Sequence, residues 1–161
     1  MTVNQRTAIH RSAWLELDPI TLHDLIALRQ AVFVIEQNCV YPDLDGRDVE
    51  PLTEHVWTAD EQGPTAYLRV LTEPDGASRI GRVCTRADAR GAGLAAALLV
   101  DVLNRTDRRV VVLEAQEHLA GWYNRFGFTA TGPAYLEDGI SHLPMRRNPA
   151  RPEPGLATPG R

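Results

Sequence analysis

The feature that most constrains the fold of this chain is a glycine-bearing turn between a strand-like run and a helix-like run. Residues 80–85 form a mostly apolar run typical of a strand, and residues 94–104 carry apolar side chains at helical spacing. The turn between them holds Gly91 and Gly93. A glycine turn that opens a helix leaves backbone N–H groups unpaired at a point where the helix dipole adds positive charge. The segment therefore predicts either a phosphate-binding loop or, more simply, a flexible connection.

One phosphate-binding architecture, the dinucleotide fingerprint, fits the letters of this segment but not its surroundings. Residues 91–96 match G-x-G-x-x-A, and Glu114 ends the next strand, roughly where a ribose-binding acid belongs. In that fingerprint the first glycine comes directly off the strand, whereas residues 86–90 intervene here. The chain also offers one strand–helix–strand crossover, and hairpin-like turns join its earlier strands, which favours an antiparallel sheet. We therefore reject a doubly wound dinucleotide-binding fold.

Four stretches, taken together, resemble the GNAT N-acetyltransferases. Residues 90–95 (Arg-Gly-Ala-Gly-Leu-Ala) match R/Q-x-x-G-x-G/A, the acetyl-CoA pyrophosphate loop of that family. Residues 116–128 resemble the family's helix ending in F-Y-x-x-x-G-F. Residues 29–46 and 135–142 are similar to the ElaA-type branch of the family. Because the four motifs occur in order from about Trp14 to Met145, the resemblance covers nearly the whole chain.

The resemblance implies a single α/β domain of the GNAT (acyl-CoA N-acyltransferase) fold over residues 1–147. This fold has a mixed, mostly antiparallel sheet flanked by helices, with one splayed parallel strand pair. The strands at 78–85 and 109–115 are linked by a helix, so we expect them to be that pair, with a right-handed crossover. The prolines and glycines of residues 148–161 predict a disordered tail rather than a second domain.

Hydrophobic periodicity and turn residues predict the other elements. Asp18 and Thr21 are plausible helix caps, and Pro19 suits an early helical position or a turn. In chain order, we expect a strand at 14–17, a helix at 24–37, broken structure at 38–53, strands at 55–58 and 65–72, a helix at 119–125 and two short final strands.

The resemblance implies that the chain binds acetyl-CoA as the acyl donor together with an acceptor amine, and that it uses no metal. Backbone groups of Val83 and Thr85 would meet the pantetheine arm, amides of residues 91–95 would hold the pyrophosphate, and Arg90 would add charge to a phosphate. Gln116 stands where many relatives carry an asparagine that contacts pantetheine. The expected binding set is Val83, Cys84, Thr85, Arg90, Gly91, Ala92, Gly93, Leu94, Ala95 and Gln116.

Tyr123 is the strongest catalytic candidate, because a tyrosine at this motif position lies near the sulfur in the family and can protonate the departing thiolate. Phenol and thiol pKa values lie within about two units of each other, so the proton transfer is chemically sensible. The alternative is a core tyrosine that packs with Trp122 and Phe126.

Four residues are candidates for the general base, and the sequence does not decide between them. Glu36 ends the first long helix beside the expected acceptor channel, and a partly buried glutamate has the raised pKa that a base needs. Glu114 ends the strand facing the cofactor cleft, and it is also explained as a hydrogen-bonded strand end. Histidine is the residue type whose ordinary pKa lies near neutrality, which makes His142 a candidate, and His55 is a further one. A water relay would make all four indirect participants.

The composition agrees with a compact enzyme domain and argues against nucleic acid as a partner. The chain has 161 residues, enough for one substantial core, and its net charge of −4 argues against non-specific nucleic-acid binding. Five acidic residues between the first helix and the next strand suit either a cationic substrate or a solvated face. They are Asp43, Asp45, Asp48, Glu50 and Glu54.

The sequence also predicts where in the cell the protein is found. It contains neither a signal-peptide pattern nor a membrane-spanning apolar run, so we expect no membrane partner. Its two cysteines, Cys39 and Cys84, suit a reducing cytoplasm, where we expect the protein.

We therefore expect an N-acetyltransferase that moves an acetyl group from acetyl-CoA to a primary amine by direct transfer. The alternative is a non-catalytic acyl-CoA-binding or partner-binding module on the same fold, because fold alone does not give function. A homodimer is an open alternative to a monomer. The sequence does not name the acceptor amine.

Overall fold

A computed structural model describes residues 7–150 of the chain. The strands are β1 (His10–Ser12), β2 (Glu54–Asp60), β3 (Gly63–Thr72), β4 (Ser78–Thr85), β5 (Val111–Gln116), β6 (Thr129–Ala130), β7 (Tyr135–Glu137) and β8 (Ile140–Arg147). The α-helices are α1 (Pro19–Arg29), α2 (Leu94–Arg105) and α3 (Ala120–Asn124). Residues 151–161, most of the predicted tail, lie outside the described part. Ala150, near its start, donates its N–H to the Asp107 carbonyl at 2.9 Å.

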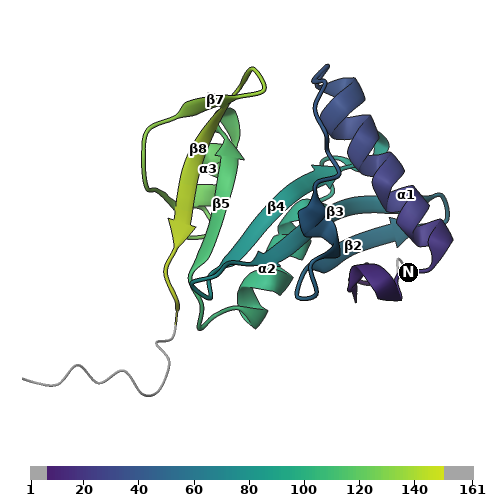
Figure 1. Cartoon of the computed structure of the whole chain (residues 1–161), viewed down its shortest axis with the longest axis horizontal. Helices are drawn as coiled ribbons and strands as arrows, with labels where there is room; N and C mark the ends of the chain where they lie inside the picture. The colour runs from purple at the N-terminus through teal and green to yellow at the C-terminus, as the bar shows by residue number, and fades with distance from the viewer. Residues whose placement is uncertain (1–6, 151–161) are drawn as a thin grey trace, which may run out of the picture.

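All eight strands form one mixed sheet with the order β1-β2-β3-β4-β5-β8-β6, and β7 pairs with β8 (Figure 1). The pairing is antiparallel except between β4 and β5, which are parallel and linked through α2. This architecture confirms the expected fold, including its one parallel pair. The C-terminal region holds three strands, the short β6 and β7 and the eight-residue β8, where the sequence suggested two short ones.

Helices cover both faces of the sheet. Leu25, Leu28 and Val32 pack with Tyr67 and Cys84 on one face of β3 and β4. On the other face, the buried side of α2 packs over the same strands, and α3 continues that layer over β5. The residues of this larger core are Val56, Ala66, Leu68, Ile80, Leu98, Leu99, Val102, Leu103, Val111, Leu113, Ala115, Tyr123, Phe128 and Met145. Between the two helical layers, β4 and β5 lie apart at the end that faces β7 and the end of the first helical segment (Figure 1).

The first helix begins and ends differently from the prediction. Asp18 caps it by accepting from the Ile20 and Thr21 amides at 3.1 and 2.9 Å, and Pro19 occupies its first position, so it starts before residue 24. After Arg29 the chain continues as a π-helix over Gln30–Glu36. Such segments are rare and occur frequently at functional sites. This one ends beside the pocket described below.

The predicted strand at 14–17 is wrong. Those residues include a 3-10 helix, Trp14–Glu16, and the first strand instead is His10–Ser12, which pairs with β2. An alternation of only four residues does not distinguish a strand from a single helical turn. Trp14 tilts against His55 at 5.4 Å between ring centroids, so its partner is a buried ring rather than a neighbouring strand.

The parallel strands β4 and β5 pair only at their starts and then diverge (Figure 1). The register contains two residue pairs, Ser78 with Val111 and Arg79 with Val112. Further along β4 an irregularity shifts its register against β3, and Arg82 takes a positive φ of 53° at that point. A bulge of this kind bends a strand and increases its twist. The divergence leaves one edge of β4 without a strand partner along its second half.

Candidate active site

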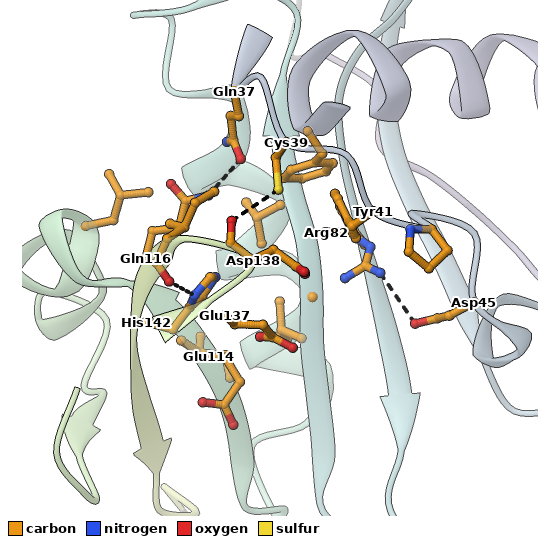
Figure 2. Close-up of a pocket in the computed structure, with 18 of the residues that line it drawn as sticks. Gln37, Cys39, Tyr41, Asp45, Arg82, Glu114, Gln116, Glu137, Asp138 and His142 are labelled. Atoms are coloured by element: carbon orange, nitrogen blue, oxygen red, sulfur yellow. Dashed lines mark hydrogen bonds and ion pairs between the residues drawn. The ribbon is translucent and has the colours of Figure 1, made fainter. Parts of the chain in front are cut away.

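A pocket of about 430 Å³ occupies the gap between β4 and β5 (Figure 2). Its walls come from both strands, from the end of the π-helix and the loop after it, from α3, and from the β7–β8 turn. The lining residues are Phe33, Gln37, Cys39, Tyr41, Pro42, Asp45, Ile80, Gly81, Arg82, Val83, Leu113, Glu114, Gln116, Leu119, Tyr123, Glu137, Asp138, Ile140 and His142. The pocket is therefore lined by residues of α3 on one face of the sheet and by residues of the π-helix on the other face.

The glycine loop lies between the end of β4 and the start of α2. Gly91 and Gly93 have positive φ angles of 81° and 74°, and a Cβ on either would meet no atom within 4 Å. Gly93 is the N-cap of α2 and supplies no side-chain cap. The first intrahelical bond runs from the Ala97 N–H to the Gly93 carbonyl, so the amides of residues 94–96 have no acceptor within the helix. The loop fits a phosphate group, since it combines open space, free amides and a helix N-terminus.

The free edge of β4 leads from this loop toward the pocket. The Arg86 N–H donates to the Thr65 carbonyl of β3 at 2.8 Å. Successive residues of a strand point their backbone groups to opposite edges, so those of Val83 and Thr85 face the gap. Cys84 faces β3, and burial of its thiol raises the pKa to about 12. Of the three β4 residues in the predicted binding set, Val83 and Thr85 thus have the placement that a pantetheine contact needs.

Arg90 lies in the glycine loop and is paired with Glu36. Its two terminal nitrogens each donate to one carboxylate oxygen at 2.6 Å, and its Nε donates to the Thr85 carbonyl at 3.2 Å. Hydrogen bonding from Arg90 lowers the pKa of Glu36. The expected raised pKa at Glu36 is therefore wrong, because the residue is exposed and ion-paired rather than partly buried, and it does not line the pocket.

Tyr123 is buried and lines the pocket through α3. Its ring meets Trp122 edge-on at 4.9 Å and Phe128 at 6.1 Å, whereas Phe126 contacts Trp122 instead. Its hydroxyl makes no hydrogen bond to any of residues 7–150. Burial raises its pKa to about 12, so the hydroxyl keeps its proton at neutral pH. The side chain is therefore a buried residue of the pocket wall whose hydroxyl is protonated at neutral pH.

His142 projects into the pocket from β8. Its Nδ1 donates to the Ile140 carbonyl at 2.8 Å, because a carbonyl oxygen only accepts. In the neutral imidazole this leaves Nε2 with a lone pair and no partner among the residues that the structure describes. Its ring stacks on Tyr135 at 5.9 Å. His142 therefore has the geometry of a base.

Glu114 also lines the pocket, but both of its carboxylate oxygens are engaged. One accepts from Arg79 Nη1 at 3.1 Å and the other from the Tyr135 hydroxyl at 2.8 Å. Tyr135 in turn stacks on His142. Glu114 is therefore in contact with His142 only indirectly, through Tyr135.

His55 lies inside the protein and outside this pocket. Its Nε2 donates to the Asp48 carbonyl at 3.0 Å, so its Nδ1 accepts from the Tyr67 hydroxyl at 2.7 Å. Burial lowers its pKa and keeps the ring neutral. Both ring nitrogens are occupied, so the structure gives His55 a structural role.

The acidic stretch after the first helix is neither a solvated face nor a free anionic surface. Asp43 and Asp48 are buried, and Arg29 binds both of them at 2.9 and 2.7 Å. Asp45 borders the pocket and is bound by Arg69 at 2.6 Å, which lowers its pKa to about 2. Arg82 pairs with Asp43 at 2.8 Å and lies over the Tyr41 ring at 5.5 Å. Three arginines thus neutralise these three aspartates.

Two contacts connect the N-terminal and C-terminal walls of the pocket. Gln116 on β5 donates to the Gln37 side chain at 3.2 Å, and the Cys39 thiol lies 3.5 Å from the Asp138 carbonyl (Figure 2). Gln116 thus lies in the pocket as expected, although a side chain from the end of the π-helix already holds its amide. The sequence analysis placed Gln37 and Cys39 in one ElaA-type stretch and Asp138 in another, but it did not predict the contacts between them. The Asp138-Gly139 pair, a hairpin-turn signal, was the one available clue to the β7–β8 wall.

The described residues contain no group of three or more histidine, cysteine or acidic side chains arranged to hold a metal ion. Across residues 7–150, none of the helices has both the length and the apolar character required to cross a membrane.

Comparison with known families and proteins gives consistent matches. The profile of the GNAT acetyltransferase domain matches residues 31–149. A UPF0039 protein of Mycobacterium tuberculosis is 42% identical over 142 residues, which cover 85% of this chain and 91% of that protein. Protein ElaA of Escherichia coli is 39% identical over 140 residues, covering 82% of this chain and 90% of ElaA.

Solved structures agree with the sequence matches. The crystal structure of an acyl-CoA N-acyltransferase from Pseudomonas aeruginosa superposes with a TM-score of 0.81 at 38% identity, covering 88% of this chain and 99% of that one. The crystal structure of Escherichia coli ElaA gives the same TM-score and the same coverage at 34% identity.

Proposed function

Because this chain belongs to the GNAT acetyltransferase family, in its ElaA-type branch, we propose that it transfers an acetyl group directly from acetyl-CoA to a primary amine. One observation carries the proposal. The glycine loop, the unpaired edge of β4 and the pocket that holds Tyr123 form one continuous path. Such a path suits a long donor with a phosphate at one end and a reactive thioester at the other.

Acetyl-CoA would lie along the glycine loop and the unpaired edge of β4. Amides of residues 93–95 at the start of α2 would hold the pyrophosphate, where the helix dipole favours negative charge. Backbone groups of Val83, and the N–H of Thr85, would pair with the pantetheine arm as a neighbouring strand would. The Thr85 carbonyl is already used by Arg90. This alignment would bring the thioester near Tyr123, and positioning would supply much of the acceleration.

Two side chains would move the protons. His142 Nε2 takes a proton from the acceptor ammonium, and the freed nitrogen attacks the thioester carbonyl. A C–N bond forms and the C–S bond breaks. The departing thiolate takes the proton of the Tyr123 hydroxyl, and the nitrogen loses its extra proton to solvent and keeps the one N–H of the amide. Exchange with solvent then returns a proton to the Tyr123 phenolate and removes the proton from His142. General acid and base catalysis of this kind contributes about 10²–10⁴-fold per group.

Glu114 would position the base rather than act as one. It holds the Tyr135 hydroxyl at 2.8 Å, and Tyr135 stacks on the His142 ring. Arg79 fixes the other carboxylate oxygen. This chain of contacts orients the imidazole, whose second nitrogen is tied to the Ile140 carbonyl.

The test begins with calorimetry of CoA binding to the folded protein, followed by acceptor-dependent thiol release from acetyl-CoA over an amine panel. We expect CoA binding and turnover with at least one amine. Binding of acyl-CoA without turnover would support the non-catalytic module. Absence of CoA binding, or tight NADH binding in its place, would overturn the proposal.

A further inference from the structure

The β7–β8 turn carries two neighbouring carboxylates over the pocket. Glu137 ends β7 and pairs with Ile140 across the hairpin, leaving Asp138 and Gly139 as a two-residue loop. Both loop residues have positive φ, 50° and 78°, which fits the type I′ turn favoured between antiparallel strands. The contact of the Cys39 thiol with the Asp138 carbonyl links this turn to the opposite wall. The backbone that carries the two carboxylates is therefore fixed.

These two carboxylates differ from the other acids of the pocket in having no counter-charge. Asp45 is paired with Arg69 and Arg82, and Glu114 with Arg79. Among residues 7–150 no arginine, lysine or histidine nitrogen lies within ion-pair distance of Glu137 or Asp138. Figure 2 shows both side chains extending from the turn across the gap toward β4.

The pocket offers no free cation to balance them. Arg82 is the one arginine or lysine among the lining residues, and its guanidinium is bound to Asp43 and Asp45 and lies over the Tyr41 ring. Adding the unpaired Glu137 and Asp138 to these neutralised pairs leaves the acceptor side of the pocket anionic. A molecule with a carboxylate of its own would be repelled there, and one with an extra positive charge would be attracted.

A second observation indicates that this space receives a ligand. The Tyr123 side chain is 94% buried (6% exposed) and lines the same pocket, yet its hydroxyl has no hydrogen-bond partner among the described residues. The hydroxyl oxygen is not shut off from the pocket space, so it is free to bond a molecule bound there. His142 also lines the pocket, and its Nε2 has no partner among the described residues. The two unsatisfied groups and the two unpaired carboxylates border one cavity.

We propose that the acceptor is a small aliphatic amine with a second cationic group and no carboxylate, namely a diamine or polyamine. This rests on the proposed acetyl transfer and adds the substrate class. The reacting ammonium gives a proton to His142 Nε2, and its nitrogen forms the amide bond as the thioester C–S bond breaks. The distant ammonium keeps its protons throughout and is held by Glu137 and Asp138.

Three probes with matched carbon chains test this. 1,5-Diaminopentane carries the second cation, pentylamine lacks it, and lysine is 1,5-diaminopentane with a carboxylate added. We expect kcat/KM for 1,5-diaminopentane to exceed that for each of the other two by about fivefold, the upper end for a charge contact with exposed carboxylates such as Glu137 and Asp138. The difference should lie mainly in KM, because the second charge stays away from the reacting atoms.

Variants then test whether Glu137 and Asp138 cause the preference for the diamine. In the double variant Glu137→Gln, Asp138→Asn, the ratio of kcat/KM for 1,5-diaminopentane to that for pentylamine should fall toward one. The control is Glu61→Gln, an exposed carboxylate in the β2–β3 turn, which should leave the ratio unchanged. Equal kcat/KM for diamine and monoamine in the wild-type protein, or lysine as the best of the three, would overturn the proposal.

A binding measurement separates this proposal from the proposed function. Calorimetry of each amine against the CoA-saturated protein should show tighter binding of 1,5-diaminopentane than of pentylamine, even if none of the probes is turned over. Equal binding would overturn the diamine acceptor while leaving acetyl transfer to other amines intact. Failure of CoA itself to bind would instead overturn the proposed function.

Discussion

Arg90 and Glu36 are joined by two hydrogen bonds of 2.6 Å, one to each carboxylate oxygen. The first residue belongs to the glycine loop and the second ends the π-helix, so the ion pair connects the phosphate-binding side of the protein to the acceptor side. The sequence analysis gives the two residues separate roles. Arg90 would bind a phosphate, and Glu36 would act as the base. Their pairing means that Arg90 must leave Glu36 before it reaches a phosphate.

Glu36→Gln should therefore strengthen CoA binding. Without the carboxylate, Arg90 is free to contact the phosphates, and we expect the Kd for CoA to fall by up to about fivefold, the limit for an exposed ion pair. Calorimetry measures this, with Arg90→Gln as the opposite control that weakens binding. A large loss of kcat in Glu36→Gln with no change in Kd would restore Glu36 as the base.

Gly93→Ala should weaken CoA binding, and Gly76→Ala provides a matched control. Both glycines have positive φ, 74° and 86°, and a Cβ on either meets no atom within 4 Å. Each alanine should cost about 1–2 kcal/mol of unfolding free energy through backbone strain, measured by urea titration. Only Gly93 lies at the start of α2, so only its variant should raise the Kd for CoA, by about tenfold or more. Equal Kd values for both variants would contradict a phosphate site at this loop.

Tyr123→Phe should lower kcat by about 10²–10⁴-fold while leaving CoA affinity nearly unchanged. The phenylalanine ring keeps the contacts with Trp122 and Phe128 and removes only the hydroxyl. Because burial raises the Tyr123 pKa to about 12, the loss should be the same at every pH from 7 to 10. Steady-state rates across that range check this. Wild-type turnover in the variant would leave Tyr123 as a core residue only.

His142→Asn should lower kcat by a similar factor. The asparagine amide donates to the Ile140 carbonyl as Nδ1 does, but nothing replaces Nε2. The fold and the Kd for CoA should therefore be kept while the base is lost. Added imidazole should restore part of the rate, measured as thiol release. Full activity in the variant would assign the proton to a water chain instead.

Acid should destabilise the protein partly through Asp45. Hydrogen bonding from Arg69 lowers its pKa to about 2, against about 3.9 in an unfolded chain. A lowered pKa means that the carboxylate stabilises the fold above about pH 4, and that this contribution is lost as the pH falls toward 2. Asp45→Asn should thus be less stable than the wild type at pH 7, with the difference closing between pH 4 and pH 2. Urea titrations at several pH values measure this, and a constant difference would contradict the assignment.

The parts of the site that sequence predicted are those carried by short local motifs. Gly91, Gly93 and Tyr123 occupy the places that their motifs imply, because a helix start and a helical face depend on a few neighbouring residues. The profile and the relatives confirm the family and the fold that the motifs predicted. The roles of the individual site residues stay predictions until the variants are measured.

The parts that sequence missed depend on contacts between distant segments. The positive φ of Arg82 and the resulting bulge accompany a guanidinium held by Asp43, nearly forty residues earlier. The acidic stretch looked like a surface because its partners Arg29 and Arg69 lie on other elements. Local pattern does not contain this information, so the charge balance of the pocket emerges only in three dimensions.

The two residue pairs that join β4 to β5 also form a hinge between the two parts of the sheet. Among the described residues, β4 and β5 make no further strand pairing, although the Arg79–Glu114 ion pair also joins them, so the two sides of the sheet meet along about two residue pairs. A rotation of a few degrees about Ser78 and Val111 would keep these pairs while changing the separation of the far ends of the two strands. For an acyl-CoA bound in this gap, we expect the angle between β4 and β5 to set the length of acyl chain that fits between Val83 and Gln116, and substitutions near Ser78 and Val111 to alter chain-length preference without changing the pocket wall.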